Sequence, residues 1–82
     1  MRYPKLIRRH HVRSEAVRSI GYDESEWVLQ VEFHSGKVYN YFRVPPREHE
    51  ALRTAESIGE YLNREIKRYY EYELFETEAS WS

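Results

Sequence analysis

The sequence of 82 residues contains no cysteine, so disulfide bonds and thiolate metal sites are excluded. No apolar run approaches the roughly 20 residues that a membrane-spanning helix requires, and the N-terminus has no hydrophobic signal core. The 13 basic and 14 acidic residues nearly cancel, so the strong positive excess typical of nucleic-acid-binding domains is missing. These absences predict a soluble, cytoplasmic protein with no membrane partner.

Aromatic residues, by contrast, are plentiful: they make up 16% of the chain and include eight tyrosines. A chain of this length forms one small domain, which buries only about 60% of its unfolded surface. Because each aromatic side chain buries about 150–250 Å², aromatic rings give a small core a large buried area. The core is therefore expected to depend on rings as well as aliphatic side chains.

Charge is distributed unevenly along the chain. Residues 1–22 hold six Lys or Arg and one Glu, whereas residues 71–82 hold four Glu and no basic residue. We interpret residues 1–13 as a flexible basic arm and residues 73–82 as a frayed acidic tail. A basic arm is typical of proteins that contact nucleic acid or an acidic partner, although a solvated tail that aids solubility has the same composition.

Residues 27–34 show the clearest periodicity. Trp27, Leu29, Val31 and Phe33 alternate with the residues between them, which predicts a strand with one buried face. The stretches at 16–23 and 38–44 are also strand-like, and prolines follow the second of them. The three segments together predict an antiparallel meander of three strands.

The turn at Ser35 and Gly36 decides where Tyr39 and Tyr41 point. A two-residue turn places both tyrosines on the solvated face, whereas a three-residue turn pairs Tyr39 with Val31 and places both rings on the core face. The longer turn requires a positive φ only at Gly36, while the shorter one also requires it at a serine. We therefore favour the longer turn and buried rings.

Two helices are expected after the strands. Pro46 suits the first position of a helix over residues 46–55, and Ser57 with Glu60 forms a capping box that begins a second helix over residues 57–70. The expected fold class is therefore α+β, with a three-stranded antiparallel meander followed by two helices packed on one face. The predicted core contains Leu29, Val31, Phe33, Leu52, Leu62 and Ile66.

Several short motifs occur in a recognisable order: Ser19-Ile20-Gly21-Tyr22-Asp23, Phe33, Gly36, Tyr39-Asn40-Tyr41, Val44-Pro45, and Ser57 with Gly59, Asn63, Ile66 and Tyr69. Over about residues 12–72 this order resembles the KTSC domain, a family named for its occurrence at the C-terminus of some lysyl-tRNA synthetases. The resemblance implies a domain over residues 14–72 with the order β-β-β-α-α. It also implies relatives among free-standing small bacterial proteins, and a suggested but unassigned role in RNA binding.

Catalysis is not expected from these residues. The four histidines, at positions 10, 11, 34 and 49, form no known catalytic or metal-binding spacing. The serines have no base that the sequence reveals, and an enzyme of this size needs an organised nucleophile, base and oxyanion site. We expect a non-enzymatic domain without metal or cofactor.

Binding of RNA or other single-stranded nucleic acid is the sharper hypothesis, because such ligands are held by aromatic stacking beside cations. The competing interpretation is that the tyrosine pair simply belongs to the core. The candidate residues are Arg18, Lys37, Tyr39, Tyr41 and Arg43, with Tyr22, Arg8, Arg9 and Arg13 as further candidates.

Two other binding modes fit the sequence. A three-stranded sheet has edges that can add a strand from a partner, so the domain is alternatively a protein-docking module that uses a sheet edge or an aromatic face. Ser57 and Gly59 also begin a helix, where free backbone N–H groups favour an anion. The simpler interpretation of that pair is a helix cap and a close packing contact.

Overall fold

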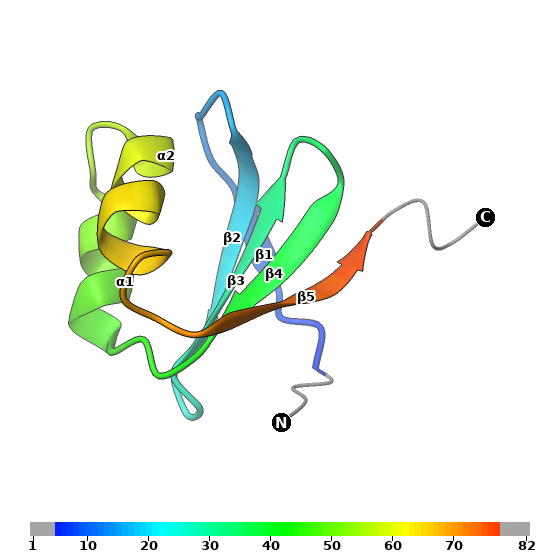
Figure 1. Ribbon diagram of the computed structural model, residues 1–82, viewed down its shortest axis with the longest axis vertical. Coiled ribbons are helices and arrows are strands. Elements are labelled where there is room, and N and C mark those ends of the chain that lie inside the picture. The colour runs from blue at the N-terminus through cyan, green and yellow to red at the C-terminus, as the bar shows by residue number, and fades with distance from the viewer. Residues whose placement is uncertain (1–4, 78–82) are drawn as a thin grey trace.

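The computed structural model describes residues 5–77, which form an antiparallel sheet covered on one face by helices (Figure 1). The five strands lie side by side in chain order, and each pairs antiparallel with the next. The strands are β1 (Arg9–His11), β2 (Val17–Asp23), β3 (Val28–Phe33), β4 (Lys37–Tyr41) and β5 (Tyr72–Thr77). The helical segments are α1 (Pro46–Arg53), α2 (Ile58–Tyr61) and the π-helical turn η1 (Leu62–Ile66).

The expected α+β class is confirmed, but the three-stranded sheet was wrong, because the sheet has five strands. β1 falls in the segment expected to be a basic arm, and β5 falls almost entirely in the segment expected to be an acidic tail. Both strands pair through their backbones with the edges of the meander, so neither needs a strong pattern of its own. The remaining parts of the arm and tail, residues 1–4 and 78–82, lie outside the described residues.

The turn before β4 has the expected longer form. Gly36 has a φ of 96°, and Val31 lies opposite Tyr39 in the β3–β4 pairing. This register places the ring of Tyr41 in the core with 2% of its surface exposed, while Tyr39 is half-buried. Trp27 does not share the buried face, because β3 begins one residue later and the Trp27 side chain is 45% exposed.

The core lies between the sheet and the helices. Of the residues predicted for it, Phe33 is only partly buried at its margin, and the other five are buried. The buried cluster consists of Val17, Ile20, Leu29, Val31, Tyr41, Val44, Leu52, Ile58, Leu62 and Ile66.

Both helical segments begin as the sequence predicts. Pro46 is the first residue of α1, and the Ser57 side chain accepts a hydrogen bond from the backbone N–H of Glu60 at 3.3 Å. The second helix is shorter than expected, since it ends in η1 at Ile66. No helix within residues 5–77 is both long enough and apolar enough to cross a membrane.

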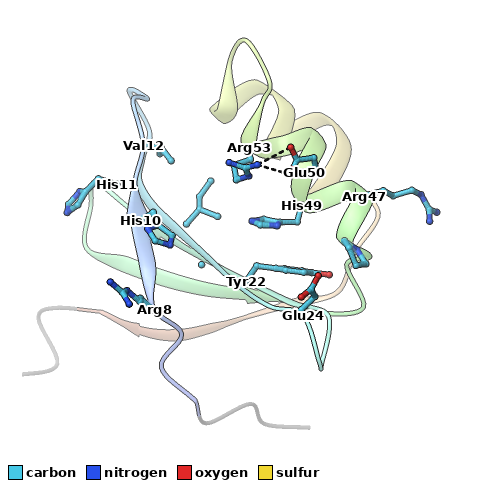
Figure 2. Close-up of a pocket in the computed structure, with 13 residues that line it drawn as sticks. Arg8, His10, His11, Val12, Tyr22, Glu24, Arg47, His49, Glu50 and Arg53 are labelled. Carbon is cyan, nitrogen blue, oxygen red and sulfur yellow. Dashed lines mark hydrogen bonds and ion pairs between the residues drawn. The ribbon is translucent and has the colours of Figure 1, made fainter.

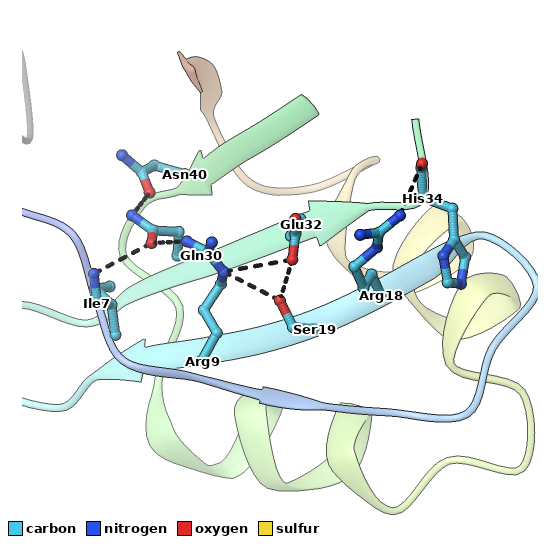
Figure 3. A network of polar contacts seen from close by, with 8 residues as sticks. All are labelled: Ile7, Arg9, Arg18, Ser19, Gln30, Glu32, His34 and Asn40. Atoms are coloured by element: carbon cyan, nitrogen blue, oxygen red, sulfur yellow. Dashed lines mark hydrogen bonds and ion pairs between the residues drawn. The ribbon is translucent and has the colours of Figure 1, made fainter. Parts of the chain in front are cut away.

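The face of the sheet opposite the helices carries a polar network (Figure 3). The Arg9 guanidinium donates to the side-chain oxygens of Gln30 and Ser19, at 2.7 and 3.1 Å. Gln30 in turn donates to the Asn40 side chain at 2.9 Å, and Ser19 donates to Glu32 at 2.7 Å. The network joins four adjacent strands and holds the basic N-terminal segment against the sheet.

Candidate nucleic-acid interface

A groove of about 900 Å³ lies between the β1–β2 edge of the sheet and helix α1 (Figure 2). It is formed by segments that are far apart in the sequence, from the N-terminal strand to the first helix. Six of the side chains that line it carry basic nitrogens, and two carry carboxylates. The six are Arg8, His10, His11, Arg47, His49 and Arg53, and the two are Glu24 and Glu50.

Two stacked rings form one wall of the groove. The rings of Tyr22 and His49 have centroids 4.3 Å apart and planes inclined by only 10°. The Tyr22 hydroxyl donates a hydrogen bond to the carbonyl of Val44, which fixes the position of its ring. Burial, aided by the nearby Arg53 charge, lowers the pKa of His49 below its usual value. The imidazole is therefore mainly neutral at pH 7 and offers a flat aromatic surface.

The arginines of the groove differ in their surroundings. Figure 2 shows Arg53 on the inner side of the groove near His49, whereas Arg8 and Arg47 stand at its rim. One terminal nitrogen of Arg53 donates to both carboxylate oxygens of Glu50, at 2.8 and 3.0 Å. This pair is more than half exposed, so solvent screens it and the guanidinium keeps much of its attraction for a further anion.

Local structure explains why these side chains converge. His10 lies opposite Ile20 in the β1–β2 pairing, which places it on the helix-covered side of the sheet. Glu50 and Arg53 are three residues apart on α1, so they are neighbours on the surface of the helix, and Arg47 lies one turn before Glu50. Strand pairing and helical periodicity thus bring both sets of side chains to the same groove.

Comparison with known proteins identifies the family. Residues 13–70 match the KTSC domain model. The chain belongs to the KTSC domain family. A crystal structure of a KTSC domain protein from Yersinia pestis has a TM-score of 0.80 and 30% sequence identity, covering 84% of this chain and 97% of that one.

Two kinds of relative share the KTSC domain sequence. An uncharacterized protein from Stutzerimonas stutzeri is 40% identical over 67 residues, which cover 80% of this chain and 94% of the relative. A lysine–tRNA ligase from Nostoc punctiforme is 39% identical over 57 residues, which cover 70% of this chain but only 10% of the ligase. The chain thus matches nearly all of a small relative and about a tenth of a large one.

The KTSC fold does not bring together the five residues predicted for nucleic-acid binding. Tyr41 is buried, so its ring is not a platform at the surface. The same burial raises the pKa of its hydroxyl. Lys37 begins β4 and Arg43 follows its end, so about 20 Å of extended chain separates them at roughly 3.3 Å per residue. Arg43 instead forms an exposed ion pair with Glu71 at 3.3 Å.

Three of the predicted residues lie near a second, smaller hollow. Lys37 and Tyr39 line a pocket of about 420 Å³, together with Lys67 and His34. Arg18 reaches the same region, where its guanidinium donates to the His34 carbonyl at 3.5 Å. This pocket has two lysines but lacks a stacked ring pair like that of the groove.

The predicted anion site at the start of α2 has a simpler geometry. The Ser57 oxygen accepts the cap hydrogen bond described above. A Cβ atom placed on Gly59 would lie 3.6 Å from the Ser14 hydroxyl and 3.7 Å from the Ala16 methyl, which are ordinary contact distances. These contacts are those of a helix cap and of a helix start packed beside the β1–β2 connection.

Sequence reasoning missed the α1 side of the groove. The three-residue spacing of Arg47, Glu50 and Arg53 was visible in the predicted helix, but it has the form of an ordinary solvated face. The contact between His49 and Tyr22 depends on tertiary structure and leaves no local signal. Within residues 5–77, no group of three or more His, Cys, Asp or Glu side chains is arranged to hold a metal ion.

Proposed function

We propose that this KTSC domain binds single-stranded RNA, without catalysing a reaction, in the groove between β1 and α1. The observation that carries the proposal is the combination of the stacked Tyr22–His49 pair with three exposed arginines in one groove. Stacking surfaces beside a positively charged groove are the usual means of holding single-stranded nucleic acid.

The two parts of the groove suit the two parts of a nucleotide. The neutral His49 imidazole is suited to stacking with a base, because its ring is already held parallel to Tyr22. Arg53 lies beside this ring and Arg8 stands at the rim, where phosphates of the backbone would pass. An unpaired strand fits such a groove better than a duplex, since the bases of a duplex are stacked on one another.

The names of the longer relatives support RNA as the ligand. The name lysine–tRNA ligase refers to an RNA, and a segment similar to this chain occurs in the protein that bears it. The small net charge of −1 indicates that affinity must come from the local groove charges rather than from the whole surface. We therefore expect moderate affinity with a clear dependence on salt.

Fluorescence anisotropy with a labelled single-stranded RNA tests the proposal between about 50 and 200 mM salt. Arg53→Ala and Arg8→Ala should each reduce the slope of log K against log salt by about 0.7, the value for one lost phosphate contact on a single strand. His49→Ala should weaken binding by about 1–3 kcal/mol, because it removes the stacking surface.

The matched control is Arg64→Ala, which removes an exposed arginine that does not line the groove. This variant should keep both the affinity and the salt slope of the parent protein. Equal losses in Arg64→Ala and Arg53→Ala would contradict the proposal, as would the absence of binding at the lowest salt concentration. A selective loss in Lys37→Ala would place the RNA at the smaller pocket instead.

A further inference from the structure

β5 forms the edge of the sheet opposite to β1, and within residues 5–77 its only neighbouring strand is β4 (Figure 1). The backbone N–H of Phe42 donates to the Glu71 carbonyl at 2.9 Å. Hydrogen-bonded pairs alternate along an antiparallel ladder, so Glu73 also directs its backbone groups toward β4. The backbone N–H and C=O groups of Tyr72 and Leu74 therefore point to the open side of β5.

Two exposed apolar side chains lie at this edge. Of the five large apolar side chains that are exposed in the described part of the chain, Tyr72 and Leu74 belong to β5. The Tyr72 ring contacts Tyr39 in an edge-to-face arrangement with centroids 5.8 Å apart, yet 44% of Tyr72 remains exposed. Leu74 is 50% exposed. The row of apolar side chains thus continues to the outer side of β5, where a further strand could cover it.

The other face of the sheet is acidic at the start of β5, before the irregular pairing with β4 at Phe75. Successive side chains of a strand point to opposite faces, so Glu71 and Glu73 share the face away from Tyr72 and Leu74. Cross-strand neighbours are favoured when apolar side chains meet apolar ones and when opposite charges meet. The complementary strand therefore alternates apolar residues with lysine or arginine. A second copy of β5 paired about Glu73 is a poor complement, because it would place the two Glu73 side chains opposite each other.

We propose that the open edge of β5 binds an extended segment of a partner protein in which apolar residues alternate with basic residues. The segment adds a sixth strand to the sheet through the outward backbone groups of Tyr72 and Leu74. Its apolar residues cover these two side chains, and its cations lie opposite Glu73. β5 begins after residue 70, where the family match ends, so the surface is formed by a part of this chain outside that match.

Titration of the ¹⁵N-labelled protein with a synthetic peptide of alternating valine and lysine tests this inference. The amides of Tyr72 and Leu74 should become protected from hydrogen exchange, because they gain hydrogen-bond partners in the added strand. A peptide with glutamate in place of lysine should bind more weakly, and Glu73→Lys should reverse that preference. Leu74→Ala should weaken binding by up to about fivefold, the upper end of the range for one cross-strand pair.

The control variant is Leu6→Ala, which removes an exposed apolar side chain from the N-terminal segment and should leave peptide binding unchanged. Equal binding of the acidic peptide, or perturbation of residues away from β5, would overturn the inference. Protection of the same amides by self-association at high protein concentration, without peptide, would identify a second copy as the occupant and would also overturn it. RNA binding is measured separately and involves the opposite edge, so either proposal can fail without the other.

Discussion

The imidazole of His49 lies flat on the phenol ring of Tyr22, with the two ring centroids 4.3 Å apart. This contact joins helix α1 to the second strand of the sheet and so fixes one wall of the groove. Burial in the contact disfavours the charged imidazole and lowers its pKa. The stack is thus both a structural link and the source of an uncharged aromatic surface beside arginines.

The lowered pKa of His49 predicts a pH dependence of stability. As the pH falls below about 6.5, the unfolded chain binds a proton at this residue before the folded protein does. The contribution of His49 to stability is therefore fully present above that pH and is lost as the pH falls toward the folded-state pKa. Denaturant unfolding between about pH 7.5 and 5 should depend less on pH in His49→Gln than in the parent protein.

His11→Gln is the matched control for this experiment. His11 also lines the groove but its side chain is exposed, so its removal should leave the pH dependence of stability close to that of the parent protein. An unchanged pH dependence in His49→Gln would show that the imidazole is not held neutral by burial. A ring-proton titration of His49 by NMR measures the same pKa directly.

Much of the central meander could be predicted because its signals are local. Gly36 alone can adopt the left-handed conformation of the turn easily, and this fixed the register that buries Tyr41. The alternation around Leu29 is also a local signal, and it identified the face of β3 that packs against the helices. Trp27, at the start of the pattern, departed from it, because the chain there adopts a φ of 58° in the hairpin. The expectation of a single buried face was also wrong, since Val28 and Gln30 on the opposite face of β3 are buried as well.

The two outer strands and the groove could not be predicted in the same way. β1 has only three residues, and its position depends on backbone pairing with β2 and on the contact between Arg9 and Gln30. β5 is joined to β4 across a long intervening segment that contains both helices. The groove requires β1, β2 and α1 to be placed together, so its residues have no spacing in the sequence that indicates a common site.

Gly21 should be intolerant of any side chain. A Cβ atom at this position would lie 2.7 Å from the Arg8 carbonyl oxygen and 2.8 Å from a methyl group of Ile7. Because one of these contacts is with the backbone, the N-terminal segment must move to relieve it. Gly21→Ala should therefore lower the free energy of unfolding by about 1–3 kcal/mol. It should also weaken RNA binding, because Arg8 would leave the groove.

Gly59→Ala provides the comparison for Gly21→Ala. The contacts that a Cβ atom would make at Gly59 are of ordinary length, and alanine favours the helical conformation more than glycine does. This variant should be neutral, or more stable by up to about 1 kcal/mol, in thermal or denaturant unfolding. Unchanged stability in Gly21→Ala would show that the segment around Arg8 does not lie closely against Gly21.

Tyr39 and Tyr41 should respond differently to removal of their rings, although they lie two residues apart on one face of β4. Tyr41 is 2% exposed, so Tyr41→Ala should lower the free energy of unfolding by about 3–5 kcal/mol, as is typical for a buried aromatic residue. Tyr39 is half-buried at the margin of the core, and its ring forms edge-to-face contacts with Phe33 and Tyr72. Tyr39→Ala should therefore cost less, about 1–3 kcal/mol.

RNA binding by these two variants separates the groove from the surface that the sequence first suggested. At a temperature where each variant remains folded, Tyr39→Ala should bind RNA as tightly as the parent protein, because Tyr39 does not line the groove. Any loss in Tyr41→Ala should follow its unfolded fraction and disappear when stability is restored by cooling or by a stabilising co-solvent. If Tyr39→Ala instead lost about 1–3 kcal/mol of binding while fully folded, the ring would be a stacking platform and the Lys37 pocket would be the RNA site.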